Sequence, residues 1–188
     1  MKKMVIGALC AALPLLAQHS AEININTDDI EVAGVMELSE GFSYEGLSSR
    51  NYLFARYLYS GESKTRDDNL VEAGFLATGN LSGMPALTLG IGIKGAFSED
   101  YAAIPIGLTL RYDIPSEWQV ALDADVYVAP SPLVFSDGDS YSAYRIGVSF
   151  RPIPNGAIYG GYRNIDLDYD KGSDDFNDGW YIGVRFYF

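Results

Sequence analysis

Few residues of this chain could perform catalysis, and nearly all of those are carboxylates. The 188-residue sequence holds 25 Asp and Glu against 13 Lys and Arg, with one His and one Cys. Cys10 lies in an apolar N-terminal run, and His19 follows that run. Because His and Cys supply many of the general bases, nucleophiles and metal ligands of enzymes, the composition argues against an enzyme. We expect no catalytic residue and no cofactor.

One pair of carboxylates has a spacing that hydrolysis could use. Asp123 and Asp125 alternate along one segment and would share a strand face, where two acids can act on a glycosidic bond. Arg111 and Arg145 belong to segments of the same pattern. Ion pairing with these arginines is the explanation we favour.

The densest acidic cluster is a weak candidate for a cation site. Oxygen ligands of this kind suit Ca²⁺ or Mg²⁺. An EF-hand is excluded, because Lys171 stands where that loop requires Gly. A solvated acidic loop is therefore the favoured explanation for the cluster, whose candidate ligands are Asp166, Asp168, Asp170 and Asp174.

The glycines of residues 90–95 spell the GxGxxG pattern of dinucleotide-binding proteins. In those proteins the glycines open a helix, whose amides hold a pyrophosphate. Here they lie inside an alternating segment with no helix after it. Small residues that leave room inside a barrel explain them better.

The N-terminus is typical of a secretory signal peptide. Lys2 and Lys3 precede an uncharged apolar run over residues 4–16, which is shorter than the ~20 residues of a spanning helix. We place the leader at residues 1–21, cut after Ala21, with a cut after Ala17 as the alternative. Residues 22–188 then form one domain, which has lost Cys10.

From about residue 50 onward, apolar residues recur at every second position. The clearest segments are residues 87–97, 102–114, 118–128 and 143–151, and weaker ones are 52–59, 70–80, 157–169 and 179–188. Their lengths approach the ~9–11 residues that a tilted strand needs to cross a bilayer. The pattern predicts a transmembrane β-barrel.

The alternate face of these strands carries small residues and charges of both signs. Such a face suits the crowded interior of a narrow barrel, where charges must pair. A solvated sheet face with scattered ion pairs is the alternative. The predicted lumen charges are Arg56, Glu72, Lys94, Arg111, Asp113, Asp123, Asp125, Arg145, Arg163 and Arg185.

The last eight residues match the terminal signal of bacterial outer-membrane barrels. Its elements here are Tyr181, Gly183, Phe186 and the terminal Phe188. The barrel-assembly machinery reads that signal, so it is the expected partner during biogenesis. The motif also ends in aromatic residues, which suit a membrane interface.

The turn residues and the strands predict the topology. Longer outer loops are expected at residues 60–68, 98–100, 129–140 and 170–178, and short inner turns at 81–85, 115–117 and 151–156. Eight strands account for residues 52–188. Residues 30–38 and 42–47 would add two more, so an antiparallel up-and-down barrel of ten strands is expected. Eight strands, with residues 22–48 as a plug or a bent strand, is the alternative.

The order of these segments resembles the small outer-membrane proteins of the YfaZ type. The resemblance is clearest in residues 101–108, 125–132, 160–165 and 178–184, and weakest over 22–50. It implies an outer-membrane barrel and supplies no catalytic residues.

The expected protein is therefore an integral barrel of a Gram-negative outer membrane, with a filled lumen and a structural or surface-binding role. Its partners would be outer-membrane lipid and lipopolysaccharide, and it would be a monomer. The net charge of −12 argues against nucleic acid. A narrow channel for small or cationic solutes and a soluble periplasmic ligand-binding barrel are the alternatives.

Overall fold

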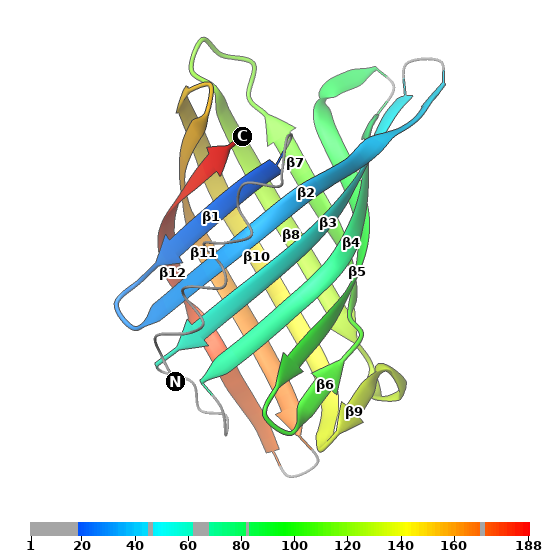
Figure 1. Cartoon of the computed structure of the whole chain (residues 1–188), viewed down its shortest axis with the longest axis vertical. Helices are drawn as coiled ribbons and strands as arrows, with labels where there is room; N and C mark the ends of the chain where they lie inside the picture. The colour runs from blue at the N-terminus through cyan, green and yellow to red at the C-terminus, as the bar shows by residue number, and fades with distance from the viewer. Residues whose placement is uncertain (1–18, 45–46, 62–67, 82, 170–171) are drawn as a thin grey trace.

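The computed structural model describes residues 19–44, 47–61, 68–81, 83–169 and 172–188. Within these residues ten strands close an antiparallel barrel, and two short strands extend one end of it (Figure 1). The barrel strands are β1 (His19–Ile25), β2 (Asp29–Tyr44), β3 (Leu47–Ser60), β4 (Asn69–Leu81), β5 (Met84–Ser98), β7 (Ile106–Asp113), β8 (Val120–Ala129), β10 (Gly138–Ile153), β11 (Gly156–Tyr169) and β12 (Gly172–Tyr187).

Each barrel strand pairs with the barrel strands before and after it in the chain, and β1 pairs with β12 to close the ring. At the seam His19 N donates to Phe188 O at 3.3 Å, and Phe188 N donates to His19 O at 2.9 Å. A closed ring leaves no unpaired barrel edge, which is the condition for strands to lie in lipid. The predicted up-and-down barrel of ten strands is confirmed.

The first strands of the barrel are not those expected. Residues 30–38 and 42–47 were assigned to one strand each, whereas β2 runs through Asp29–Tyr44 and β1 precedes it. The short β1 does alternate, with Ile23 and Ile25 exposed outside and Glu22 and Asn24 buried inside. Its polar inner face lowers its hydropathy, and three of its seven residues fall within the expected leader.

The segment 102–114 was expected to be one strand and is two. β6 (Tyr101–Ala103) pairs with the end of β5 on one side and with β9 (Val134–Ser136) on the other, and β7 starts after Pro105. Pro105 has no N–H to give to a ladder, while Ile104 N donates to Leu133 O at 2.8 Å. A short 3-10 helix, η2 (Ser131–Leu133), precedes β9, and no helix in the described part of the chain could span a membrane.

The acidic segment 170–178 was expected to be a loop, but most of it is strand. β11 and β12 stay paired almost to their tips, from Asn164 opposite Asp178 to Tyr169 opposite Gly172. Phe176 is completely buried and anchors this end of β12. The Asp residues of this segment made a buried apolar side chain hard to recognise in the sequence.

The barrel has two distinct ends. The C-terminal end holds the start of β1, the end of β12 and the short connections from β7 to β8 and from β10 to β11. The loop end holds β6, β9 and residues 26–28 (Figure 1). The segments at 115–117 and 151–156 do form connections at the C-terminal end, as expected from their Pro and Gly residues.

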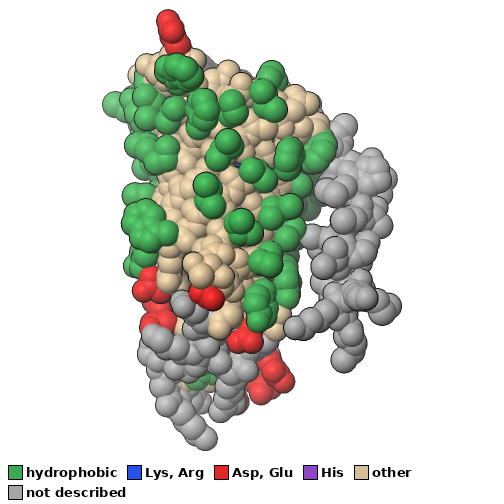
Figure 2. All heavy atoms as spheres, turned by 90° about the vertical axis from the view of Figure 1, so that its left-hand side faces the viewer, with side chains coloured by type: hydrophobic (Ala, Val, Ile, Leu, Met, Phe, Trp, Pro, Cys, Tyr) green, Lys and Arg blue, Asp and Glu red, His purple; other side chains and the backbone are tan. Residues whose placement is uncertain are grey.

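The outer wall of the barrel is apolar. Ile91, Leu108, Ile146 and Ile182 are each 58–60% exposed, although all four are central strand residues. Figure 2 shows apolar side chains over most of the height of one face, with carboxylates gathered toward the loop end. Exposed apolar strands are what a bilayer requires of a barrel.

The domain boundary at residue 21 stays a prediction, because residues 1–18 lie outside the described part of the chain. His19, Ser20 and Ala21 pair with both β2 and β12. A cut after Ala21 would remove these pairs, whereas the alternative cut after Ala17 would keep them. We expect the intact mass of the mature protein to match a chain that begins at Gln18. A mass matching a start at Glu22 would contradict this expectation.

Candidate functional site

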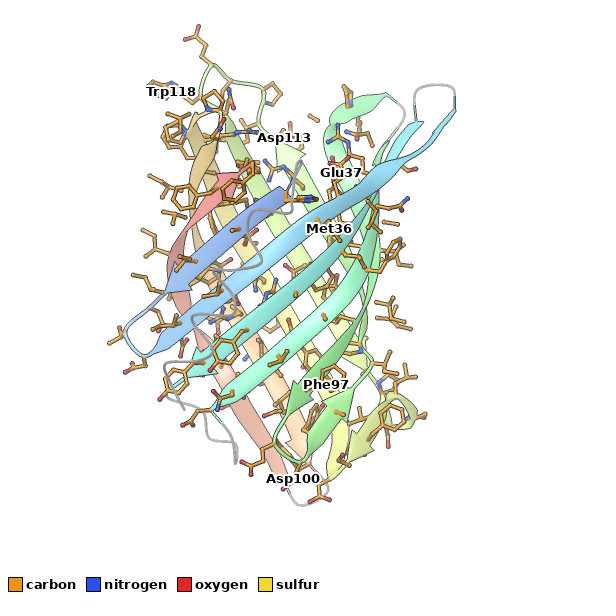
Figure 3. All side chains as sticks on the ribbon, in the orientation of Figure 1. Met36, Glu37, Phe97, Asp100, Asp113 and Trp118 are labelled. Atoms are coloured by element: carbon orange, nitrogen blue, oxygen red, sulfur yellow. The ribbon has the colours of Figure 1, made fainter. Side chains whose placement is uncertain are left out.

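The ten predicted lumen charges all lie inside the barrel or at its mouth. Each belongs to an ion pair with N···O separations of 2.5–3.9 Å. Strand register places several partners directly opposite one another, as with Arg56 and Glu72 or Arg111 and Asp123. At the C-terminal end Asp113 and Glu37 lie near the mouth of the lumen, while Asp100 lies at the loop end (Figure 3).

Glu31 of β2 is the centre of the charge network. Its carboxylate is fully buried and accepts hydrogen bonds from Arg145 Nη2 at 3.2 Å and from Arg163 Nη1. Arg56 Nε lies 3.6 Å from Glu31 Oε1, and Asn24 Nδ2 donates to the same oxygen at 2.6 Å. Side chains from β1, β2, β3, β10 and β11 therefore converge on one carboxylate.

A second buried carboxylate, Glu72 of β4, extends the network across the lumen. Arg56 Nη1 donates to it at 3.0 Å, Lys94 Nζ at 2.6 Å and Tyr141 Oη at 2.6 Å. The Lys94 ammonium also lies 4.4 Å from the centroid of the Tyr127 ring, a cation–π distance. Paired charges from β2, β3, β4, β5, β10 and β11 thus cross the middle of the barrel.

Two glycines of the wall make room for Tyr127, a bulky side chain beside the paired charges. A Cβ on Gly92 would lie 2.4 Å from Tyr127 Oη, and one on Gly107 would lie 2.4 Å from Tyr127 Cδ1. Gly92 belongs to the GxGxxG pattern, which lies within β5 with no helix after it. The glycine leaves room in the lumen, as expected, and Tyr127 takes up that room.

The loop half of the lumen is filled. An apolar cluster of buried side chains packs beyond the charge network, and it includes Tyr101, Tyr141, Leu167 and Phe176. Buried polar side chains of the barrel strands lie beside this cluster. Among them, Asn177 Nδ2 donates to Ser60 Oγ at 3.1 Å. The expectation of a filled interior describes this half of the barrel well.

The C-terminal half of the lumen is a cavity of about 630 Å³. Its wall runs from Ser20, Asn80 and Tyr187 near the C-terminal end down to Lys94 and Arg145 in the charge network. Basic groups outnumber acidic ones in this wall. They are Arg50, Arg56, Lys94, Arg111, Arg145, Arg151 and Arg185, against Glu22, Asp113, Asp123 and Asp125.

Three acidic members of the network were absent from the predicted set. Glu22 accepts from Arg185 Nε at 2.6 Å, Asp29 lies 3.5 Å from Arg163 Nη2, and Glu31 is the centre of the network. Each of these three acidic residues is next in the sequence to an isoleucine whose side chain faces outward. The two-residue period of those isoleucines was the available signal for a polar inner face.

Of the four candidate cation ligands, only Asp166 and Asp168 have described side chains, and each contacts a serine of β10. Asp168 accepts from Ser140, and Ser142 Oγ donates to Asp166 at 3.4 Å. The side chains of Asp170 and Asp174 lie outside the described residues. No group of three His, Cys, Asp or Glu residues suited to a metal ion occurs among the residues that are described.

The candidate hydrolytic pair is engaged in other contacts. Asp123 accepts from Arg111 Nη1 at 2.9 Å and from Ser149 Oγ at 3.0 Å. Asp125 lies opposite Arg145 in the ladder, with 3.9 Å between Arg145 Nε and Asp125 Oδ2. Both carboxylates face the cavity as members of ion pairs, which is the arrangement that we favoured from the sequence.

The terminal motif divides between the two faces of β12. Phe186 and Phe188 are 48% and 59% exposed on the outer wall, whereas Tyr181 and Gly183 face the lumen. Gly183 is required by close packing, since a Cβ there would lie 1.9 Å from Asn24 Oδ1 and 2.7 Å from the backbone oxygen of Ile23.

A comparison with protein families gave a match over nearly the whole chain. A family model described as "YfaZ precursor" matches residues 2–188. Among solved structures, a chain from "Unveiling the Mechanism Behind the in-meso Crystallization of Membrane Proteins" is 14% identical, with a TM-score of 0.44. The match covers 91% of this chain and 83% of that one. A comparison with curated proteins gave no match.

The charge network predicts a large stability loss for Glu31→Gln. Removing the charge leaves three arginines of the lumen without their shared buried counter-ion, so the free energy of unfolding should fall by roughly 3–5 kcal/mol. Asp123→Asn is the matched control, because Asp123 and Arg111 are 37% and 36% exposed. It should cost about 1 kcal/mol or less. Urea unfolding of the purified barrel measures both, and equal losses would contradict the central role of Glu31.

The close approach at Gly183 gives a second prediction. Gly183→Ala should slow or prevent folding into detergent micelles in vitro, where no assembly machinery is present. Gly34→Ala is the control, because a Cβ at Gly34 meets nothing within 4 Å. If both variants fold like the wild type in vitro, the packing explanation of this glycine is wrong.

Proposed function

Because the chain belongs to the YfaZ precursor family and closes a ten-stranded barrel, we propose that it is an integral outer-membrane protein with a structural or surface-binding role. The proposal rests on the paired charges and the apolar cluster that together fill the middle and the loop half of its lumen. Glu31, Glu72 and their basic partners close the middle of the barrel, and the apolar cluster fills the loop half. A barrel closed in this way is suited to anchoring and binding rather than to transport.

The outer wall supports the placement in a membrane. Strand residues such as Ile91 and Leu108 are apolar and exposed, and aromatic residues end the terminal strand. Outer-membrane lipid and lipopolysaccharide are therefore the proposed surroundings. The barrel-assembly machinery is the proposed partner of the terminal motif. A closed barrel has no free edge for pairing with another copy, which supports a monomer.

The loop end is the proposed outer surface. Its exposed carboxylates include Asp28, Glu99, Asp100, Asp137 and Asp178. Both chain ends of the described barrel lie at the opposite end, which would face the periplasm. An acidic outer surface disfavours nucleic acid as a partner. The paired state of Asp123 and the scarcity of His and Cys support a protein without enzymatic activity.

The two alternatives make different demands on the molecule. A narrow channel would need the paired charges around Glu31 and Glu72 to separate and the apolar cluster beyond them to open. A soluble periplasmic barrel would have to keep an apolar outer wall in water, which is unfavourable because burial of such surface is worth ~25 cal/mol per Å². The paired charges argue against a channel, and the exposed apolar wall argues against a soluble barrel.

Two measurements test the proposal. The protein is expected to fractionate with outer membranes and to migrate faster unheated than boiled on a denaturing gel. Planar-bilayer recordings of the same folded sample are expected to show no discrete conductance steps. Recovery in the soluble periplasmic fraction would refute the membrane placement, and reproducible steps would refute the closed lumen.

A further inference from the structure

The charges in the wall of the C-terminal cavity already have counter-ions. Arg111 Nη1 lies 2.9 Å from Asp123 Oδ1. Arg185 Nε lies 2.6 Å from Glu22 Oε1. The deeper basic groups pair with fully buried carboxylates such as Glu72. A charged ligand would have to displace one member of such a pair and leave the other uncompensated, which is costly inside a protein. The wall therefore suits a neutral polar ligand.

Two tyrosine hydroxyls face this cavity without a partner. Tyr127 of β8 and Tyr181 of β12 both line it, and neither hydroxyl takes part in a hydrogen bond among the described residues. The two residues are only 5% and 7% exposed, yet neither hydroxyl oxygen is one of the inaccessible unpaired polar atoms of the described structure. Each hydroxyl therefore keeps accessible surface in the cavity, where it can both donate and accept hydrogen bonds.

Glycines and basic side chains hold these two hydroxyls in place. A Cβ on Gly92 would lie 2.4 Å from Tyr127 Oη, and a Cβ on Gly161 would lie 3.0 Å from Tyr181 Oη. Each hydroxyl therefore occupies space that a larger residue in the wall would take. A basic side chain also packs on each ring, at 4.4 Å and 5.4 Å from the ring centroid. The rings are oriented before any ligand arrives, which lowers the entropy cost of binding.

Threonines continue the hydroxyl lining along one row of the sheet. Strand register places Thr78 of β4, Gly90 of β5 and Thr109 of β7 side by side. Asp125 of β8 is next in this row, opposite Thr109. Both threonines and the carboxylate line the cavity. This part of the wall thus offers neutral hydroxyls beside an acceptor, a combination that matches a ligand whose own groups both donate and accept hydrogen bonds.

We propose that this cavity binds a neutral sugar, a ligand with several hydroxyl groups and no charge. The sugar hydroxyls exchange hydrogen bonds with Tyr127, Tyr181 and the threonine row, and the C–H face of the ring packs against Phe54 and Leu76, which also line the cavity. The cavity volume of about 630 Å³ lies within the ~300–1,000 Å³ of small-molecule sites. The inference rests on the proposed function only for the compartment that supplies the sugar, the periplasm at the C-terminal end.

The test uses the folded full barrel in an ethoxylated alkyl detergent, which has neither a charge nor a sugar headgroup that would compete. The neutral probes are methyl glucoside, methyl galactoside and methyl mannoside. Calorimetric titrations, corrected with protein-free micelles, should show saturable binding of at least one of them. Analogues of the tightest binder that carry a carboxylate or an ammonium group at C6 should bind at least about tenfold more weakly. Cyclohexylmethanol, a ring with a single hydroxyl, should also bind at least about tenfold more weakly.

Tyrosine variants locate the site. Tyr127→Phe and Tyr181→Phe each remove one hydroxyl and keep the ring, so each should weaken sugar binding about threefold to tenfold. Both variants should fold like the wild type, because neither hydroxyl has a partner among the described residues. Tyr112→Phe is the matched control, since Tyr112 is 39% exposed on the outer wall, and it should bind the sugar like the wild type. In wild-type protein with ¹³C-labelled tyrosine rings, the signals of Tyr127 and Tyr181 should shift on titration.

Three results would overturn the inference. The first is absence of saturable binding of all three neutral sugars to a heat-modifiable sample. The second is binding of a charged analogue or of cyclohexylmethanol as tight as that of the sugar, and the third is unchanged sugar binding by both tyrosine variants of the cavity. The first result leaves the outer-membrane barrel intact while removing its ligand. A sample that is not heat-modifiable instead counts against the proposed function, so the two failures are distinguishable.

Discussion

The burial of one carboxylate, that of Glu31, is the constraint on which the rest of the barrel depends. A fully buried charge is tolerable only when charged and hydrogen-bonding partners surround it. Here arginines from β3, β10 and β11 and Asn24 from β1 meet that requirement. Because a slip of one residue turns every side chain to the other face, these contacts also specify the register of the strands. Their loss would place charges against lipid.

The same requirement divides the lumen into two halves of different character. On the loop side, the network is continuous with a cluster of buried aromatic and aliphatic side chains. On the C-terminal side, smaller residues such as Thr88, Thr109 and Gly147 line the wall, and a cavity remains. The open space of the lumen therefore lies in the C-terminal half of the barrel.

The distribution of charge follows from the fold rather than from the composition. Carboxylates occupy the exposed loop end, where water solvates them, and also the lumen, where basic groups neutralise them. Basic groups with described side chains occupy the lumen and its mouth. The net charge of the chain therefore describes its outer surface and is a poor guide to its interior, where the basic groups of the cavity wall lie.

The sequence alone determined the barrel and the lumen face of ten charged residues, and it favoured ten strands over eight while misplacing the first two. A two-residue period assigns the two faces of a strand locally, and membrane strands need that period along their whole length. It did not reveal that β6 and β7 are separate strands divided at Pro105, or that Phe176 is buried within the paired part of β12, because both depend on partners distant in the chain.

The tertiary structure alone decided which charges meet. Glu31 is one acidic residue among 25 in the sequence, and nothing local distinguishes it from the others. Its partners Arg145 and Arg163 are 114 and 132 residues away in the chain. Only closure of β1 onto β12 brings these strands around one lumen. The sequence determined which residues face inward, and the closed ring determined which of them lie within bonding distance.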